Sequence, residues 1–240
     1  MTKRMGTVDP RLRDDPGLRI ALAGRILEAA GCASGVGGQI SVRDPGGVGF
    51  WAAAFEHLDR IDPTRVAHLD DSLQLLEGHV RLAPALRSHA LVYRRRPDVD
   101  AVIHLHSHHV AVLSCTSELV GMFHVSAVLF DGEQVLHVDD SIRPHTAVVD
   151  TLGDAKVAIM KNHGALVVSD SLEHAVVEAI TLESCARIHL DARRHGGSEI
   201  APLEVEAGKK NFRPHHLEHT WDAWCGRMLD GWPAPDEEQR

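Results

Sequence analysis

The chain has 240 residues, which is enough for one sizeable hydrophobic core or for two domains. Its 44% hydrophobic and 25% charged residues are typical of a globular protein, and its formal net charge of -9 argues against nucleic acid as a partner, because phosphate backbones require clustered Lys and Arg. Four widely spaced cysteines without a C-x-x-C pair, no apolar signal core at the N-terminus and no apolar run of membrane-spanning length predict a cytoplasmic protein with reduced thiols and no membrane partner.

The N-terminal half of the chain predicts helices that alternate with short strands. Apolar positions at helical spacing between Pro16 and Cys32 indicate an amphipathic helix, which Gly31 ends. A second helix is expected over 84–96, and its basic end before Pro97 is expected to be solvated. Alternating or apolar runs between turn signals predict strands at 40–43, 48–54, 66–69, 73–76 and 99–106.

The C-terminal half predicts more short strands and one long helix. The expected strands are 125–130, 133–138, 155–160 and 165–168. The expected helices are 107–118 (helix or turn), 146–152, 171–194 with a serine cap, and a short amphipathic helix in the tail that contains Trp221 and Trp224. Mixed strands and helices of these lengths predict one α/β domain, in which helices cover a central, largely antiparallel sheet.

The most informative stretch is His104-Leu105-His106, on the strand predicted over 99–106. Because successive side chains of a strand alternate between its faces, both imidazoles project from one face, where they can chelate one metal ion if a third ligand arrives. His163, beside Gly164 at the end of another apolar run, is the candidate for that ligand. In a chain with 18 histidines the alternative is an ordinary set of polar side chains, but a third histidine at a strand end favours the metal site.

Four segments, in this order and spacing, resemble the class II aldolase/adducin-head family over about residues 17–195. They are Gly38–Arg43, His89–Ser107, Lys161–Leu166 and Ser171–Glu183. The resemblance implies a single domain over 1–240 that forms an α/β/α sandwich with a C-terminal helical tail at 196–240. It also implies a homotetramer with active sites at the subunit interfaces. It places His104, His106 and His163 as ligands of a catalytic divalent ion, with Zn²⁺ expected and Fe²⁺, Mn²⁺ or Co²⁺ as alternatives.

The chain departs from the family at the position of the acid/base Glu that the phosphate-cleaving aldolases carry four residues before His89. That position is Ala85, which cannot transfer a proton. The positions that match the family's phosphate site are Gln39, Ala54-Phe55 and Ala83-Pro84, which leave few donors for a phosphate dianion. The substrate expected from these departures is a small, non-phosphorylated carboxylic acid.

Further residues are candidates for proton transfer or for substrate binding. His137 aligns near a Tyr that the aldolases receive from the neighbouring subunit, and His109 follows the metal-binding strand by one helical turn; either can transfer a proton near neutral pH. The alternative for His137 is a half-exposed strand histidine. Candidates for holding the substrate, each of them otherwise a surface or structural residue, are Arg43, Arg87, Arg143 and Gln39. Glu183 in the long helix is expected to have a structural role.

These features predict a metal-dependent carbon–carbon lyase, and among such enzymes they favour a decarboxylase of a hydroxy-aromatic or hydroxy/oxo acid. Loss of CO₂ requires no prior C–H abstraction, so it needs no Glu at position 85. Decarboxylases of dihydroxyphthalate-like acids in the family make that substrate class the most specific expectation. The alternatives are an aldol or retro-aldol lyase with another base, an Fe(II)-dependent oxidative decarboxylase, and a non-catalytic adducin-head-like binding module, against which the three retained histidines argue.

Overall fold

A computed structural model describes residues 15–32, 34–138 and 144–229, and its centre is an eight-stranded sheet of order β4-β3-β2-β1-β5-β8-β7-β6. The strands are β1 Gln39–Arg43, β2 Phe50–Ala53, β3 Val66–Leu69, β4 Leu75–Glu77, β5 Ala101–Leu105, β6 Gln134–His137, β7 Val157–Met160 and β8 Gly164–Ser169. Within these described residues every neighbouring pair is antiparallel except β6 and β7. The largely antiparallel sheet expected from the sequence is therefore confirmed.

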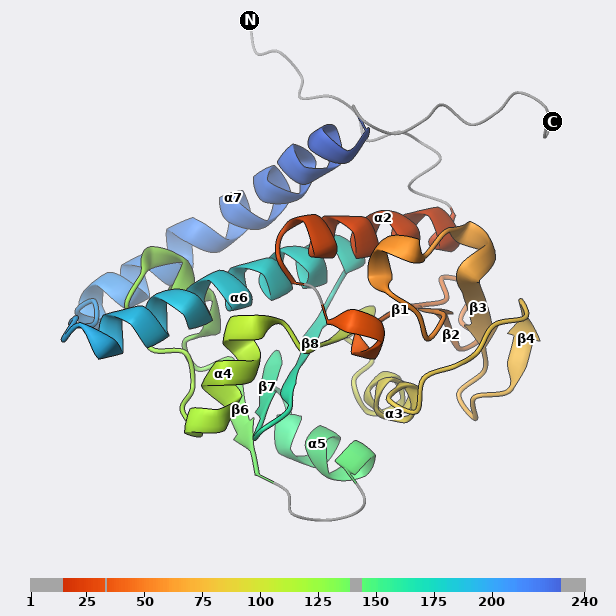
Figure 1. The fold of residues 1–240 in the computed structure, drawn as a ribbon, viewed down its shortest axis with the longest axis horizontal. Helices are drawn as coiled ribbons and strands as arrows, with labels where there is room; N and C mark the ends of the chain where they lie inside the picture. Colours follow the sequence, from red (N-terminus) through yellow and green to blue (C-terminus); the bar gives the residue numbers. More distant parts are fainter. Residues whose placement is uncertain (1–14, 33, 139–143, 230–240) are drawn as a thin grey trace, which may run out of the picture.

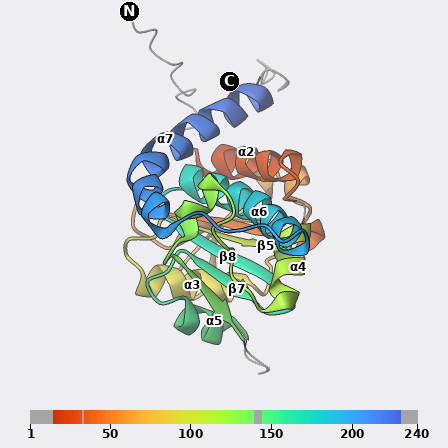
Figure 2. The same cartoon turned by 90° about the vertical axis from the view of Figure 1, so that its left-hand side faces the viewer.

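Helices cover both faces of the sheet, so that the fold has three layers (Figures 1 and 2). The α-helices are α2 Pro16–Ala29, α3 Leu86–Arg95, α4 His108–Thr116, α5 Pro144–Leu152, α6 Leu172–Arg194 and α7 Pro202–Leu229. Short 3₁₀ helices are η1 Gly35–Gly37, η2 Leu58–Arg60, η3 Pro63–Arg65 and η4 Val125–Phe130. α2 and α6 pack on one face and α3 and α5 on the other, while α7 lies outside α6. None of the helices in the described part of the chain is both long and apolar enough to cross a bilayer.

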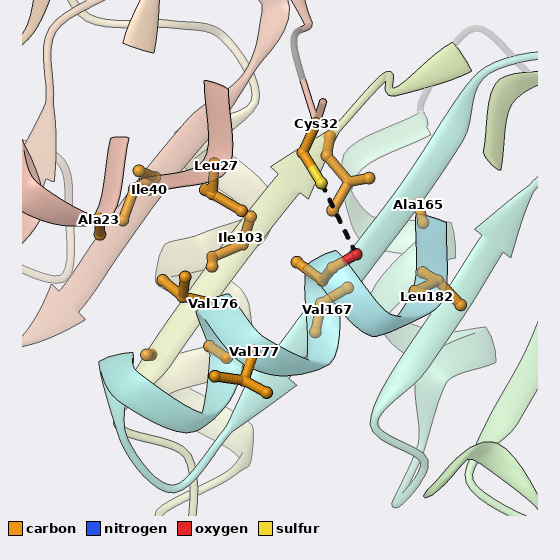
Figure 3. Close-up of a cluster of buried hydrophobic side chains, with 14 of the residues drawn as sticks. Ala23, Leu27, Cys32, Ile40, Ile103, Ala165, Val167, Val176, Val177 and Leu182 are labelled. Carbon is orange, nitrogen blue, oxygen red and sulfur yellow. Dashed lines mark hydrogen bonds between the residues drawn. The ribbon is translucent and has the colours of Figure 1, made fainter. Parts of the chain in front are cut away.

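Strand alternation divides the core into two clusters. On β1 and β5, Ile40 and Ile103 belong to the cluster under α2 and α6, which Figure 3 shows with Leu27, Val176 and other buried side chains. Val102 belongs to the cluster under α3 and α5. Residues two apart on a strand share a face, so His104 lies on the same face as Val102, the α3 and α5 face. The fold thus sets the orientation of the first candidate metal ligand.

Two elements differ from the expectations. Residues 125–130 form the 3₁₀ helix η4 and not a strand, with Ala127 and Phe130 buried in the core. A short apolar run does not by itself distinguish a buried strand from a buried helical turn. The tail helix α7 has 28 residues and is not short, because Leu217, Trp221 and Cys225, four residues apart, are buried along one side of it.

Candidate active site

Three histidines from two separate segments of the chain converge at one end of the sheet. His104 is on β5, His106 follows that strand, and His163 lies in the tight turn between β7 and β8. The Nε2 atoms of His104 and His106 are 2.8 Å apart. One ring nitrogen from each of the three histidines lies within 4.8 Å of the other two. The structure therefore brings together the three residues that the sequence analysis proposed as metal ligands.

Local backbone features hold two of these rings in place. A Cβ added at Gly37 would lie 2.5 Å from His106 Nδ1, and one added at Gly164 would lie 2.9 Å from His106 Cδ2, so that both glycines make room for the imidazole. The backbone N–H of His106 donates to Ser34 Oγ at 2.8 Å. The turn that presents His163 is closed by Asn162, whose φ of 57° lies in the left-handed region that Asn tolerates.

The chemistry of this donor set fits a divalent metal ion. Burial, together with the neighbouring His163, lowers the pKa of His106, and partial burial lowers the pKa of His163. Both rings are therefore neutral near pH 7 and offer lone pairs, as metal ligation requires. Three imidazoles leave a coordination position open, which is the pattern of catalytic sites. His163 is the most exposed of the three.

The histidines line a cavity of about 290 Å³. Its other lining side chains are mostly apolar, and we call them the apolar wall: Phe55, Ala83, Pro84, Ala85, Val148, Met160 and Leu166. The remaining polar side chains at the cavity are Ser88, His137 and Lys161. Among the described residues that line it, none is Asp or Glu. Larger hollows lie along α7 and beside η4, but in the part of the chain that the structure describes neither contains a converging set of metal ligands.

His137 belongs to this cavity. It ends β6, is only 7% exposed, and its Nδ1 lies 2.8 Å from Thr151 Oγ1 on α5. In sequence it aligns near a Tyr that the aldolases receive from a neighbouring subunit. The structure places it in the cavity of its own chain, because β6 runs parallel beside β7 and ends at the same edge of the sheet as the turn of His163.

His109 does not reach the cavity. Its ring Nδ1 lies 2.7 Å from the carboxylate of Glu183, which also accepts the backbone N–H groups of His109 and Val110 at 3.0 Å each. Glu183 on α6 thus caps the N-terminus of α4, the helix that begins two residues after the candidate ligand His106. The expectation that His109 transfers a proton has to be corrected, since its ring contacts Glu183 and is not among the side chains that line the cavity.

Arg43 holds the protein's own backbone and not a substrate. It lies at the end of β1 opposite the cavity, where its guanidinium donates to the carbonyls of Tyr93, Arg96 and Val99 at 2.8 to 3.1 Å. These carbonyls lie at and just beyond the C-terminal end of α3. Arg43 therefore caps a helix, which corrects its assignment as a carboxylate-binding residue.

Among the described residues, Arg87 and Gln39 are not part of the cavity lining either. Arg87 lies on the exposed side of α3. Gln39 is fully buried opposite His104 in the β1–β5 register, and its amide donates to the carbonyl of Gly38. Arg143 lies outside the described residues.

The sequence analysis overlooked two polar residues that line the cavity. Lys161 follows β7 and its backbone N–H donates to the carbonyl of His137 at 2.9 Å. Its position directly before Asn162 and His163 in the metal-binding turn was the signal that could have identified it. Ser88 also lines the cavity, but its hydroxyl donates to the carbonyl of Ala85 at 2.6 Å.

Comparisons with known proteins identify the family of the chain. Residues 18–190 match the family described as Class II Aldolase and Adducin N-terminal domain. The chain is 31% identical over 184 residues to a 4-hydroxy-3-prenylphenylpyruvate oxygenase/4-hydroxy-3-prenylbenzoate synthase of Streptomyces roseochromogenus subsp. oscitans, a match that covers 71% of this chain and 65% of that protein. It is 27% identical over 237 residues to a 3,4-dihydroxyphthalate decarboxylase of Arthrobacter keyseri, covering 85% of this chain and 94% of that one.

Solved structures show the same fold. An L-fuculose 1-phosphate aldolase from Glaciozyma antarctica PI12 superposes with a TM-score of 0.81 at 21% identity, over 94% of this chain and 95% of that one. At this identity the likeness concerns the fold alone. The α/β sandwich expected from the sequence is confirmed, and with a family match over most of its length the chain belongs to the class II aldolase and adducin N-terminal domain family.

Proposed function

We propose that the protein is a metal-dependent lyase that decarboxylates a non-phosphorylated hydroxy-aromatic acid of the dihydroxyphthalate type. One observation carries this proposal: the cavity combines three converging imidazoles with an apolar wall, and its described lining contains no carboxylate. The relative named as a 3,4-dihydroxyphthalate decarboxylase supports the same substrate class.

The three histidines are proposed to hold Zn²⁺, with Fe²⁺, Mn²⁺ and Co²⁺ as the alternatives that imidazole ligands also accept. When bound, such an ion acts as a Lewis acid that draws the electrons released as CO₂ departs. The neutral state of His106 and His163 allows this binding near pH 7. Gly37 and Gly164 leave room for the His106 ring at the cavity.

The apolar wall argues against cleavage of a sugar phosphate. Ala83, Pro84 and Ala85 present no hydroxyl or charged group to the cavity, and Ala85 offers no proton-transferring side chain. The hydroxyl of Ser88 is already committed to the Ala85 carbonyl. A phosphate dianion needs several donors, whereas an aromatic ring needs an apolar surface, which Phe55 and Met160 help to provide.

Lys161 and His137 are proposed to supply the polar contacts with the substrate. Lys161 is the one Lys or Arg among the described residues that line the cavity, and its ammonium can pair with a substrate carboxylate. His137 is proposed to return a proton to the carbon that loses CO₂, because imidazole transfers protons near neutral pH. Both residues line the same cavity from the adjacent ends of β6 and β7.

A homotetramer is proposed from the family resemblance, and sedimentation of the purified protein tests it. Because His137 already lies in the cavity of its own chain, proton return is not expected to require a neighbouring subunit. A monomer with full turnover would contradict the tetramer but not the site.

The second candidate function is an Fe(II)-dependent oxidative decarboxylation. It is favoured by the relative named as an oxygenase, which is 31% identical to this chain. Three imidazoles also suit Fe²⁺. The two functions differ in one requirement, since only the oxidative reaction consumes O₂.

The test is metal analysis of anaerobically purified protein, followed by a substrate panel of hydroxy-aromatic acids, aliphatic 2-hydroxy acids and sugar phosphates. We expect about one divalent ion per chain, as a site with three protein ligands implies. CO₂ release is expected from the aromatic acids alone. Cleavage of a sugar phosphate, or metal-loaded protein without turnover of any acid, would contradict the proposal. His104→Ala serves as the metal-free reference.

A further inference from the structure

The contact between β6 and α5 fixes the ring of His137 at the cavity. His137 Nδ1 lies 2.8 Å from Thr151 Oγ1, which is close enough for a good hydrogen bond. The backbone of His137 is fixed as well, because it lies opposite Met160 in the β6–β7 register and its carbonyl accepts the N–H of Lys161. The remaining question is which of the two atoms, Nδ1 or Oγ1, donates.

A contact within α5 fixes the direction of the Thr151 hydroxyl proton. Thr151 Oγ1 is 3.0 Å from the carbonyl oxygen of Ala147, four residues earlier on α5. A carbonyl oxygen can only accept, so the single hydroxyl proton is donated to Ala147, as Thr side chains in helices often do. Oγ1 then presents only lone pairs to His137.

A hydroxyl whose proton is already committed can only accept a hydrogen bond from the imidazole. We infer that Thr151 is a positioning residue that holds His137 in the tautomer with the hydrogen on Nδ1, so that Nε2 is the basic nitrogen of the neutral ring. The contact is equally satisfied when the ring is protonated, because Nδ1–H donates in both states. This inference rests on the proposed function only for its consequence in the reaction.

In the proposed decarboxylation, this arrangement confines proton transfer to one nitrogen. The C–CO₂ bond breaks, CO₂ leaves as a neutral molecule, and the carbon takes up one proton in its place. Protonated His137 gives up its Nε2–H, a new C–H bond forms, and the ring returns to the neutral Nδ1–H form with its bond to Thr151 intact. Solvent then restores the proton on Nε2, so the cycle requires neither a ring flip nor a change of tautomer.

The test uses the full chain, metal-free and labelled with ¹⁵N-histidine, with long-range ¹H–¹⁵N correlation spectra that distinguish the two tautomers. His137→Gln identifies the signals of His137. We expect the Nδ1–H pattern in wild type and in Thr151→Ser, and a shift of population to the Nε2–H form in Thr151→Val, which keeps the shape but removes the hydroxyl. An Nε2–H pattern in wild type, or an unchanged pattern in Thr151→Val, would overturn the inference.

CO₂ release by the metal-loaded proteins gives the second readout. Thr151→Val is expected to lower kcat about 10- to 100-fold, because a positioned general acid contributes about 10²- to 10⁴-fold and the variant loses only its positioning. KM should stay within about twofold, and Thr151→Ser is expected to restore most of kcat. A loss of kcat that Thr151→Ser does not restore would mean a merely structural role and would overturn the inference. Spectra with the expected tautomers in a protein that releases no CO₂ from any acid would support Thr151 and contradict the proposed function.

Discussion

The two walls of the cavity are built differently. The histidine wall, made of His104, His106 and His163, comes from strand ends and a tight turn, and glycines and backbone hydrogen bonds fix its rings. The apolar wall comes largely from the loops before η2 and α3 and from α5. The first wall keeps the metal-binding pattern of its family, and the second lacks both the acid/base carboxylate and the phosphate donors. The comparison shows three converging imidazoles facing a wall with few polar groups, and the proposed function rests on this arrangement.

The largest effect is expected when one side chain of the histidine wall is removed. His163→Ala removes one of the three proposed ligands, so the metal content should fall far below one ion per chain. Activity should fall by more than about 100-fold, because removal of a residue that only supports a ligand already lowers metal affinity or activity about 10- to 100-fold. Elemental analysis and CO₂ release measure both. His215→Ala, an exposed histidine on α7, is the control that should change neither. An active, metal-loaded His163→Ala protein would rule out the assigned site.

The apolar wall is tested by placing a carboxylate where the aldolases carry theirs. Ala85→Glu should lower kcat/KM for an anionic acid at least about tenfold, because like charges at a binding site cost several kcal/mol. Ala85 precedes the first turn of α3, where a negative charge is compatible with the helix dipole, so the fold should persist. Ala85→Gln has the same size without the charge. Equal losses in both variants would attribute the effect to volume and not to charge.

Lys161 lines the same cavity, and its substitution should change mainly the binding of the substrate. Lys161→Met is expected to raise KM about tenfold or more, because a charge-assisted hydrogen bond contributes about 1.5–3 kcal/mol, with a smaller change in kcat. Lys161→Arg should recover part of the affinity. Lys210→Met, an exposed residue of α7, controls for the loss of one positive charge. An unchanged KM in the steady-state kinetics of Lys161→Met would mean that Lys161 does not bind the substrate.

The smallest effect on activity is expected behind the histidine wall, at Glu183. Burial raises the pKa of this carboxyl, but hydrogen bonds from the His109 backbone, the Ser107 hydroxyl, the Val110 backbone and the His109 ring outweigh that rise, so the net pKa lies below its ordinary value of 4.5. A carboxyl whose pKa is lower in the folded state stabilises the fold above pH 4.5 and loses that contribution as the pH falls through its folded pKa.

Glu183→Gln should therefore lower the free energy of unfolding by about 1–3 kcal/mol at pH 7, the cost of losing charged hydrogen bonds at a buried group. The difference from wild type should shrink as the pH falls well below 4.5. Denaturant unfolding at pH 7 and in acid measures it. A difference that persists unchanged in acid would mean that the carboxylate charge at Glu183 is not what stabilises α4.

The histidine wall could be predicted from the sequence because it depends on local rules. The alternation of a strand places His104 and His106 together, and a turn at Gly164 ends the strand that brings His163. Arg43 could not be assigned in this way, since alternation marks it as polar but does not show that its acceptors lie about fifty residues away, at the end of α3.

The pairing of His137 with Thr151 was equally hidden in the sequence. It depends on how α5 packs against β6, and no local pattern of either element specifies that contact. η4 was missed for a related reason, because a buried apolar run of six residues satisfies both a strand and a helical turn. Contacts that only tertiary packing creates could therefore not be predicted from the sequence.

The most direct test of the central claim is anaerobic CO₂ release from 3,4-dihydroxyphthalate by the metal-loaded wild-type protein, with His163→Ala measured beside it. The account predicts oxygen-independent CO₂ release that is lost on chelation, returns when the ion is added back to wild type, and is absent from His163→Ala. CO₂ release only when O₂ is consumed, or none from a protein that holds its full complement of metal, would contradict it.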